Sequence, residues 1–114
     1  MKYHTFKINN KEYKLRLTTG TIIETEKKLG KSILDVLMSV ENGKMPAMED
    51  LIIVLHGSLQ KFHRISIKDT YDIFDEFVDD GGDMTELIQV ITEVLQVSGF
   101  FKKQPQEQEA VASV

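Results

Sequence analysis

Several absences narrow the functions open to this chain of 114 residues. It has no cysteine, which excludes disulfides, iron–sulfur clusters and thiolate zinc sites, and which fits a reducing compartment. No stretch has the apolar length of a signal peptide or the ~20 residues of a membrane span, because the longest apolar run covers only residues 51–55. We therefore expect a cytoplasmic protein without a membrane partner.

Positive charge is also scarce over most of the chain. Residues 1–31 carry eight Lys/Arg and three Glu, a net charge of +5, whereas residues 32–114 carry six Lys/Arg and fifteen acids, a net charge of −9. Nucleic-acid binding needs a concentrated basic footprint, so we expect no nucleic-acid partner. A chain polarised in this way can associate head to tail into a homo-oligomer, although two solvated faces give the same pattern.

Apolar periodicity predicts a β-hairpin followed by helices. Residues 3–17 alternate between apolar and polar side chains on both sides of a polar turn at residues 9–12, which is typical of a half-buried antiparallel hairpin. Beyond it, apolar residues recur at helical spacing, and capping residues or glycines stand at the ends of the runs. The predicted helices cover about residues 19–29, 32–41, 47–63, 67–80 and 84–98.

The predicted fold class is α+β, an N-terminal antiparallel hairpin followed by a cluster of about five helices. The chain length and an apolar content of 41% suit one globular domain with a single core. We place this domain at residues 1–101. Residues 102–114 read KKQPQEQEAVASV and show no periodicity, so their composition predicts a disordered tail.

No residue pattern points to catalysis or to a metal. Seven carboxylates lie between Asp69 and Asp83, but no EF-hand register fits them, and most follow helical spacing opposite the apolar stripe. His56 and His63 are two helical turns apart, roughly 10 Å, which is too far to share one zinc ion. Ser58 lies within a predicted helix and lacks the strained turn that presents a nucleophile. We expect a non-enzymatic protein without a cofactor.

The segment that follows the hairpin turn resembles a known family. It reads YKLRLTTG at residues 13–20, IIETEKKLG at residues 22–30 and IL at residues 33–34. These features resemble the tail assembly chaperones of long-tailed phages and prophages of Gram-positive bacteria. In that family a Lys-Leu-Arg strand leads into a helix that ends in a Glu-Lys-x-Leu-Gly pattern, and a short leucine-rich helix follows. The resemblance covers about the first 40 residues by motif and the remainder by length and helical content only.

The resemblance implies a specific role in the host bacterial cytoplasm. Such chaperones bind the long tape measure protein and recruit tail-tube subunits during tail morphogenesis, as many copies on one client. The family also makes a longer product by ribosomal frameshifting. Residues 100–103, Phe-Phe-Lys-Lys, suit such a switch because their codons can be runs of U and A.

A partner-binding site is predicted as an apolar groove between the helices at residues 47–63 and 84–98, although for most of these residues the pattern favours a place in the core. Its members, with two phenylalanines after the last helix, are Leu55, Leu59, Phe62, Leu87, Ile91, Phe100 and Phe101. The alternative function is a small acidic protein-interaction adaptor or regulatory domain without a phage role, which binds one partner through the hairpin edge or the acidic helix.

Overall fold

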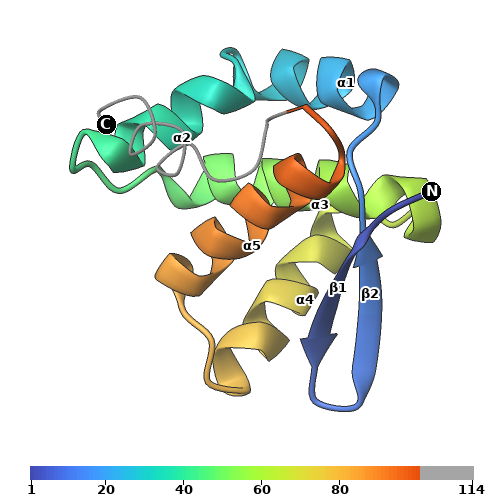
Figure 1. The fold of residues 1–114 in the computed structure, drawn as a ribbon. Coiled ribbons are helices and arrows are strands. Elements are labelled where there is room, and N and C mark those ends of the chain that lie inside the picture. Colours follow the sequence, from blue (N-terminus) through green and yellow to red (C-terminus); the bar gives the residue numbers. More distant parts are fainter. Residues whose placement is uncertain (101–114) are drawn as a thin grey trace, which may run out of the picture.

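The computed structural model describes residues 1–100, and it confirms the α+β fold class (Figure 1). Within that part of the chain, none of the helices is both long and apolar enough to cross a membrane. The elements are β1 (His4–Ile8), β2 (Lys11–Leu15), α1 (Thr19–Leu29), α2 (Ile33–Glu41), α3 (Met48–His63), α4 (Ile67–Asp79) and α5 (Met84–Val97).

The two strands form an antiparallel hairpin whose turn is shorter than predicted. Lys11 already pairs with Ile8, so that only Asn9 and Asn10 make the turn. Asn9 adopts a positive φ of 55°, which asparagine tolerates better than most residues. Phe6 lies opposite Tyr13, and the alternation turns one apolar face of the hairpin towards the helices.

Side-chain caps define where four of the five helices begin. Thr18, Ser32, Ser66 and Asp83 each accept a hydrogen bond from the backbone N–H three residues further on, at 2.9–3.3 Å. Helix α1 ends at Gly30, whose φ of 73° is the left-handed conformation of a C-terminal glycine. These local signals explain why the helix bounds follow closely from the sequence.

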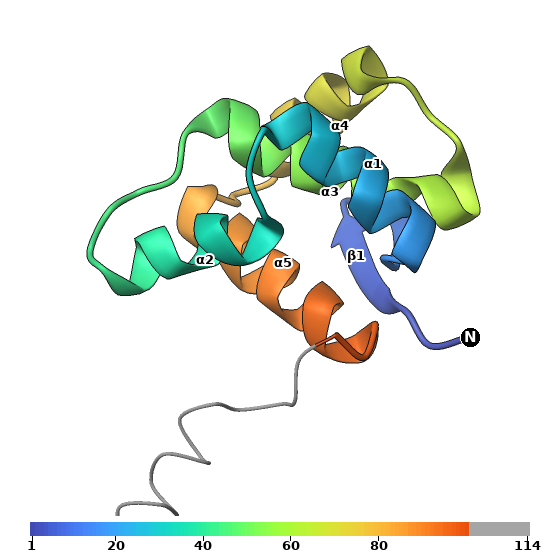
Figure 2. The same ribbon diagram turned by 90° about the horizontal axis from the view of Figure 1, so that it is seen from above.

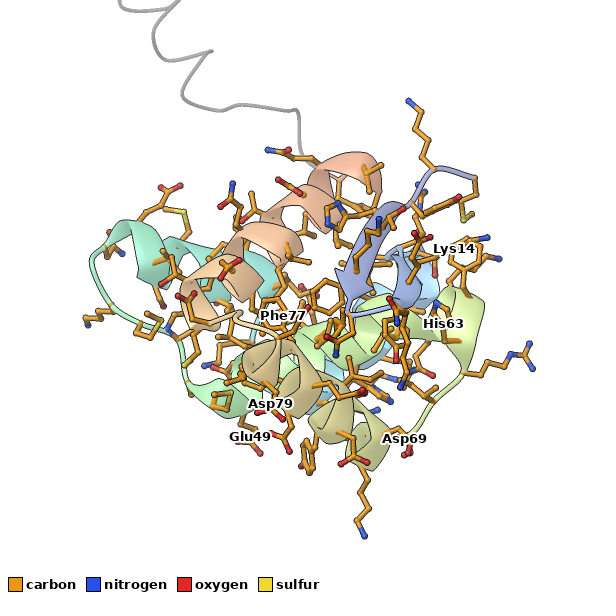
Figure 3. The ribbon with its side chains drawn as sticks, turned by 90° about the horizontal axis from the view of Figure 1, so that it is seen from below. Lys14, Glu49, His63, Asp69, Phe77 and Asp79 are labelled. Atoms are coloured by element: carbon orange, nitrogen blue, oxygen red, sulfur yellow. The ribbon has the colours of Figure 1, made fainter. Side chains whose placement is uncertain are left out.

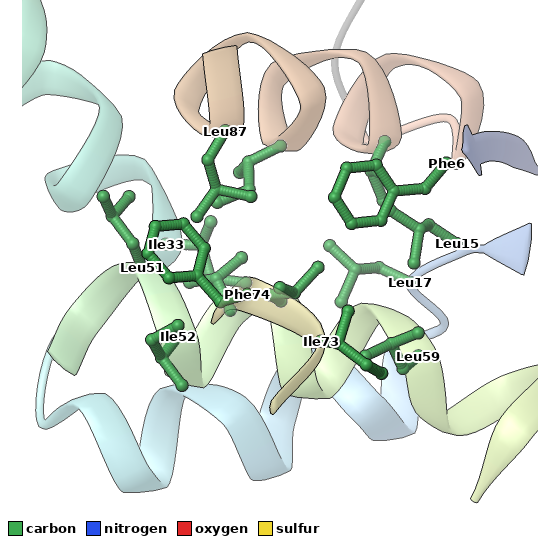
Figure 4. Packing of buried hydrophobic residues seen from close by; sticks show 14 of the residues in the cluster. Phe6, Leu15, Leu17, Ile33, Leu51, Ile52, Leu59, Ile73, Phe74 and Leu87 are labelled. Carbon is green, nitrogen blue, oxygen red and sulfur yellow. The ribbon is translucent and has the colours of Figure 1, made fainter. Parts of the chain in front are cut away.

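Helix α3 lies at the centre of the molecule and contacts α1, α4, α5 and β2 (Figures 1 and 2). Its residues Leu51, Val54, Leu55 and Leu59 are fully buried, and the close view in Figure 4 shows apolar side chains from the surrounding elements packed together in the core. Helix α1 comes closest to α3 at Gly57, where any Cβ atom would overlap the Thr25 side chain.

Hydrogen bonds attach the hairpin to the helices. The Arg16 N–H donates to the Ser58 carbonyl at 2.9 Å, and the Lys14 N–H donates to His63 Nε2 at 2.8 Å. At the turn, the Asn9 N–H donates to Asp80 Oδ2 at 3.0 Å. A two-stranded sheet is marginal by itself, so this anchoring explains how the hairpin keeps its place.

Candidate functional site: an apolar groove between α3 and α4

Four of the residues predicted to line a partner groove lie in the core, which corrects that prediction. Leu55, Leu59, Leu87 and Ile91 are at most 1% exposed. The reason is that α5 packs directly against α3, so their apolar stripes cover each other and leave no groove between them. A partner cannot contact these side chains in this conformation.

Phe62 is exposed, as a partner contact must be, but it lies at the C-terminal end of α3 in a separate aromatic cluster. Its ring packs edge-on against Tyr3 at a centroid distance of 5.6 Å. Lys14 Nζ lies 5.0 Å from the Tyr3 ring centroid and 5.6 Å from that of Phe62. Phe100 is exposed after α5, and Phe101 lies outside the described residues.

A groove of about 650 Å³ opens on another side of α3, between α3, α4 and the end of α1. Most of its lining is apolar, and charged residues stand among the rest. The lining residues are Lys28, Met48, Glu49, Ile52, Ile53, Ile67, Tyr71, Phe74 and Asp75.

Helical periodicity places the apolar residues of this groove. Ile67, Tyr71 and Phe74 lie on one face of α4 at positions i, i+4 and i+7, and Met48 and Ile52 are one turn apart on α3. Ile52 and Phe74 are buried, whereas Met48 is 41% and Tyr71 51% exposed. The groove therefore has a buried apolar base and large apolar side chains that reach into solvent.

The geometry of the groove suits a helical ligand. Side chains spaced four residues apart form ridges on a helix, and helices pack by placing the ridges of one into the grooves of another. A ridge of a helical ligand can lie in the same way between the apolar rows of α3 and α4. All the lining residues belong to helices, whose backbone groups bond within the helix, so the groove offers a ligand side chains rather than a ladder of backbone partners.

The histidines serve structural roles. His63 Nε2 accepts the Lys14 N–H, which requires the neutral ring, and His56 Nε2 donates to the Ile65 carbonyl at 3.0 Å. Burial lowers the pKa of both rings, assisted by the nearby charge of Lys14 for His63 and of Lys28 for His56. Both shifts favour the neutral imidazole.

Other polar side chains in the described part of the chain give no sign of chemistry. Ser58 is buried, and its hydroxyl donates to the Val54 carbonyl at 2.9 Å. Within residues 1–100, no group of three or more histidine or carboxylate side chains is placed to hold a metal ion. The acidic residues of α4 and its exit are mostly exposed, and Figure 3 shows Asp69 and Asp79 on the outside of the helix.

Sequence reasoning missed the α3–α4 groove and Tyr71, which is more exposed than Met48, the other exposed apolar residue of its lining. That residue stands between Thr70 and Asp72 in the acidic stretch, whose spacing predicts a solvated face. The signal that could have found it is the spacing of Ile67, Tyr71 and Phe74, a second apolar row on α4 beside the row that enters the core.

Comparison with known families places the chain without naming an activity. The model of a family of unknown function (DUF6096) matches residues 2–112, and the chain therefore belongs to that family. No curated protein and no solved structure matches the chain.

Proposed function

We propose that this chain is a phage tail assembly chaperone, a non-enzymatic protein that binds the tape measure protein and recruits tail-tube subunits during tail morphogenesis in the host bacterial cytoplasm. The motifs at residues 13–34 support this proposal from the sequence. The observation that carries it in the structure is the open apolar groove between α3 and α4, which suits a helical client.

The physical logic concerns the client. A long amphipathic helix exposes an apolar stripe that aggregates unless it is covered. A groove that takes one or two turns of such a stripe masks it and still releases it, because a small contact area gives a weak and reversible contact. Many copies along one client, held side by side as a homo-oligomer, then provide coverage through avidity.

Co-expression with the tape measure protein of the same locus tests the proposal. The wild-type chain is expected to keep the tape measure protein in the soluble fraction and to co-purify with it in several copies. Tyr71→Asp places a charge in the groove and is expected to abolish both effects. Tyr3→Asp is the matched control, because Tyr3 is also an exposed tyrosine, at 40%, but lies in the separate aromatic cluster.

Three results would count against the proposal. The tape measure protein could stay insoluble with the wild-type chain, or Tyr71→Asp could leave co-purification unchanged. A stronger loss with Tyr3→Asp than with Tyr71→Asp would move the client site to the aromatic cluster.

Mass spectrometry of products from the native locus gives independent support if it finds a longer polypeptide that shares this N-terminus and diverges near residues 100–103.

The adaptor function keeps one specific observation in its favour. A smaller hollow of about 260 Å³ lies between β1 and α5 and is lined by Thr5, Lys7 and Val90 among others. An extended peptide could add to the β1 edge there, as strands add to open sheet edges. This function predicts a one-to-one complex, so the mass of the native complex distinguishes it from a chaperone bound in many copies.

A further inference from the structure

Two carboxylates line the α3–α4 groove, and neither has an ion-pair partner among residues 1–100. These are Glu49, in the first turn of α3, and Asp75, on α4. The acids that follow them in the sequence are paired, Asp50 with Lys31 at 2.9 Å and Glu76 with Lys11 at 3.2 Å. Asp69, Asp72 and Asp79 on α4 are also unpaired within residues 1–100, but they do not line the groove. The free negative charge therefore lies where a ligand would contact the groove.

The rim has a single opposing charge. Lys28, in the last turn of α1, is the only cationic residue that lines the groove within the described chain. Glu49 belongs to α3 and Asp75 to α4, whereas Lys28 belongs to α1, so the α3–α4 part of the rim is acidic and the α1 part is basic. A partner is therefore favoured if it places positive charge next to the α3–α4 part and negative charge next to the α1 part.

From this arrangement we infer that the groove takes a basic amphipathic helix, whose apolar stripe enters the groove and whose flanking Lys or Arg residues lie against Glu49 and Asp75. The inference rests on the proposed function, since it names the chemistry of the client at the same groove. A helix satisfies its own backbone hydrogen bonds, which is what a groove lined only by helical side chains requires.

Two synthetic peptides test the inference directly. Both have about 18 residues and the same apolar stripe at i, i+3, i+4 and i+7, but one carries Lys on the flanks of the stripe and the other Glu. Fluorescence anisotropy with the full chain measures their dissociation constants. Two exposed ion pairs, with Glu49 and Asp75, give the Lys peptide an expected advantage of about three- to ten-fold, which decreases as salt is added.

A matched pair of variants locates the effect. Asp75→Lys and Asp69→Lys make the same change on the same helix, but Asp69 lies outside the groove lining. Asp75→Lys is expected to remove most of the preference for the Lys peptide, whereas Asp69→Lys keeps it. Circular dichroism checks that both variants fold, and Asp75→Asn with Asp69→Asn repeats the comparison if either Lys variant does not.

The outcomes separate this inference from the function on which it rests. Equal affinity for the two peptides would overturn the inference and leave the groove as a helix site. Equal effects of Asp75→Lys and Asp69→Lys would also overturn it, because net charge alone would then explain the preference. If neither peptide binds, both the inference and the use of this groove by a helical client are wrong.

Discussion

Apolar residues lie on both sides of α3, but they differ in how far they are exposed. On the side of α5 and the hairpin, Leu55 and Leu59 are fully buried. On the side of α4, Met48 and Tyr71 are about half exposed, and a groove remains open. An apolar stripe therefore does not indicate by itself whether it forms core or binding surface, because that depends on which helix packs against it.

The packing of α4 explains why one side stays open. Phe77 turns inward and contacts Phe6 of β1 at a centroid distance of 5.1 Å, and Ile73 is buried in the same core. Those positions use the core-facing row of α4, whereas Ile67 and Tyr71 belong to the row beside it. No element among residues 1–100 covers that second row fully, and the groove results.

Removal of a side chain from the closed side should have the largest effect on stability. Leu59→Ala creates a cavity next to α3, so we expect a loss of about 3 kcal/mol in the free energy of unfolding, measured by urea denaturation. Met48→Ala on the open side should cost less than about 1 kcal/mol. Similar losses for the two variants would contradict the division into a closed and an open side.

The close approach of α1 and α3 gives the next largest effect. Gly57→Ala places a Cβ atom into Thr25 Oγ1, and we expect a net loss of about 1–2 kcal/mol by thermal or urea unfolding. Gly20→Ala in α1 is the control, because nothing lies within 4 Å of its added Cβ, and it should be neutral or slightly stabilising.

A double variant sharpens the same test. Thr25→Ala removes the overlapping hydroxyl, so Gly57→Ala should cost less in the Thr25→Ala background than in the wild type. Equal costs in both backgrounds would show that the packing of α1 on α3 is looser than described.

The contact between α3 and β2 predicts a small dependence on pH. The pKa of His63 is lowered in the folded state, so its contribution is present above its unfolded pKa of about 6.5 and is lost as pH falls through the lower folded pKa. His63 is only partly buried, so we expect only a few tenths of a kcal/mol after solvent screening. His63→Gln, which can still accept the Lys14 N–H, should flatten the stability profile between pH 7 and pH 5. An unchanged slope would remove His63 from that role.

The smallest expected effect on stability is at Tyr71. Because about half of its side chain is in solvent, Tyr71→Ser should change the free energy of unfolding by less than about 0.5 kcal/mol. The same variant should clearly weaken binding of the Lys-flanked peptide. A large loss of stability with unchanged binding would identify Tyr71 as a structural residue. It would also contradict the description of the α4 side as an open binding surface.

Much of the fold follows from local signals, and the site does not. Alternation indicates the hairpin, and the caps at Thr18, Ser32, Ser66 and Asp83 fix where helices begin. The site depends on which helices pair, and the sequence does not state that. The apolar stripe of α3 is therefore compatible with a groove on either side, and the requirement for glycine at residue 57 appears only once α1 lies against α3.

The most direct test is NMR of the isotope-labelled chain, titrated with a helical segment of the tape measure protein, which we propose as the client. We predict that the largest shifts of backbone amides occur in the first half of α3 and along α4, around Ile52 and Tyr71. Little change is expected at the aromatic cluster of Tyr3 and Phe62. Shifts concentrated in that cluster or along β1, with α4 unaffected, would contradict the account.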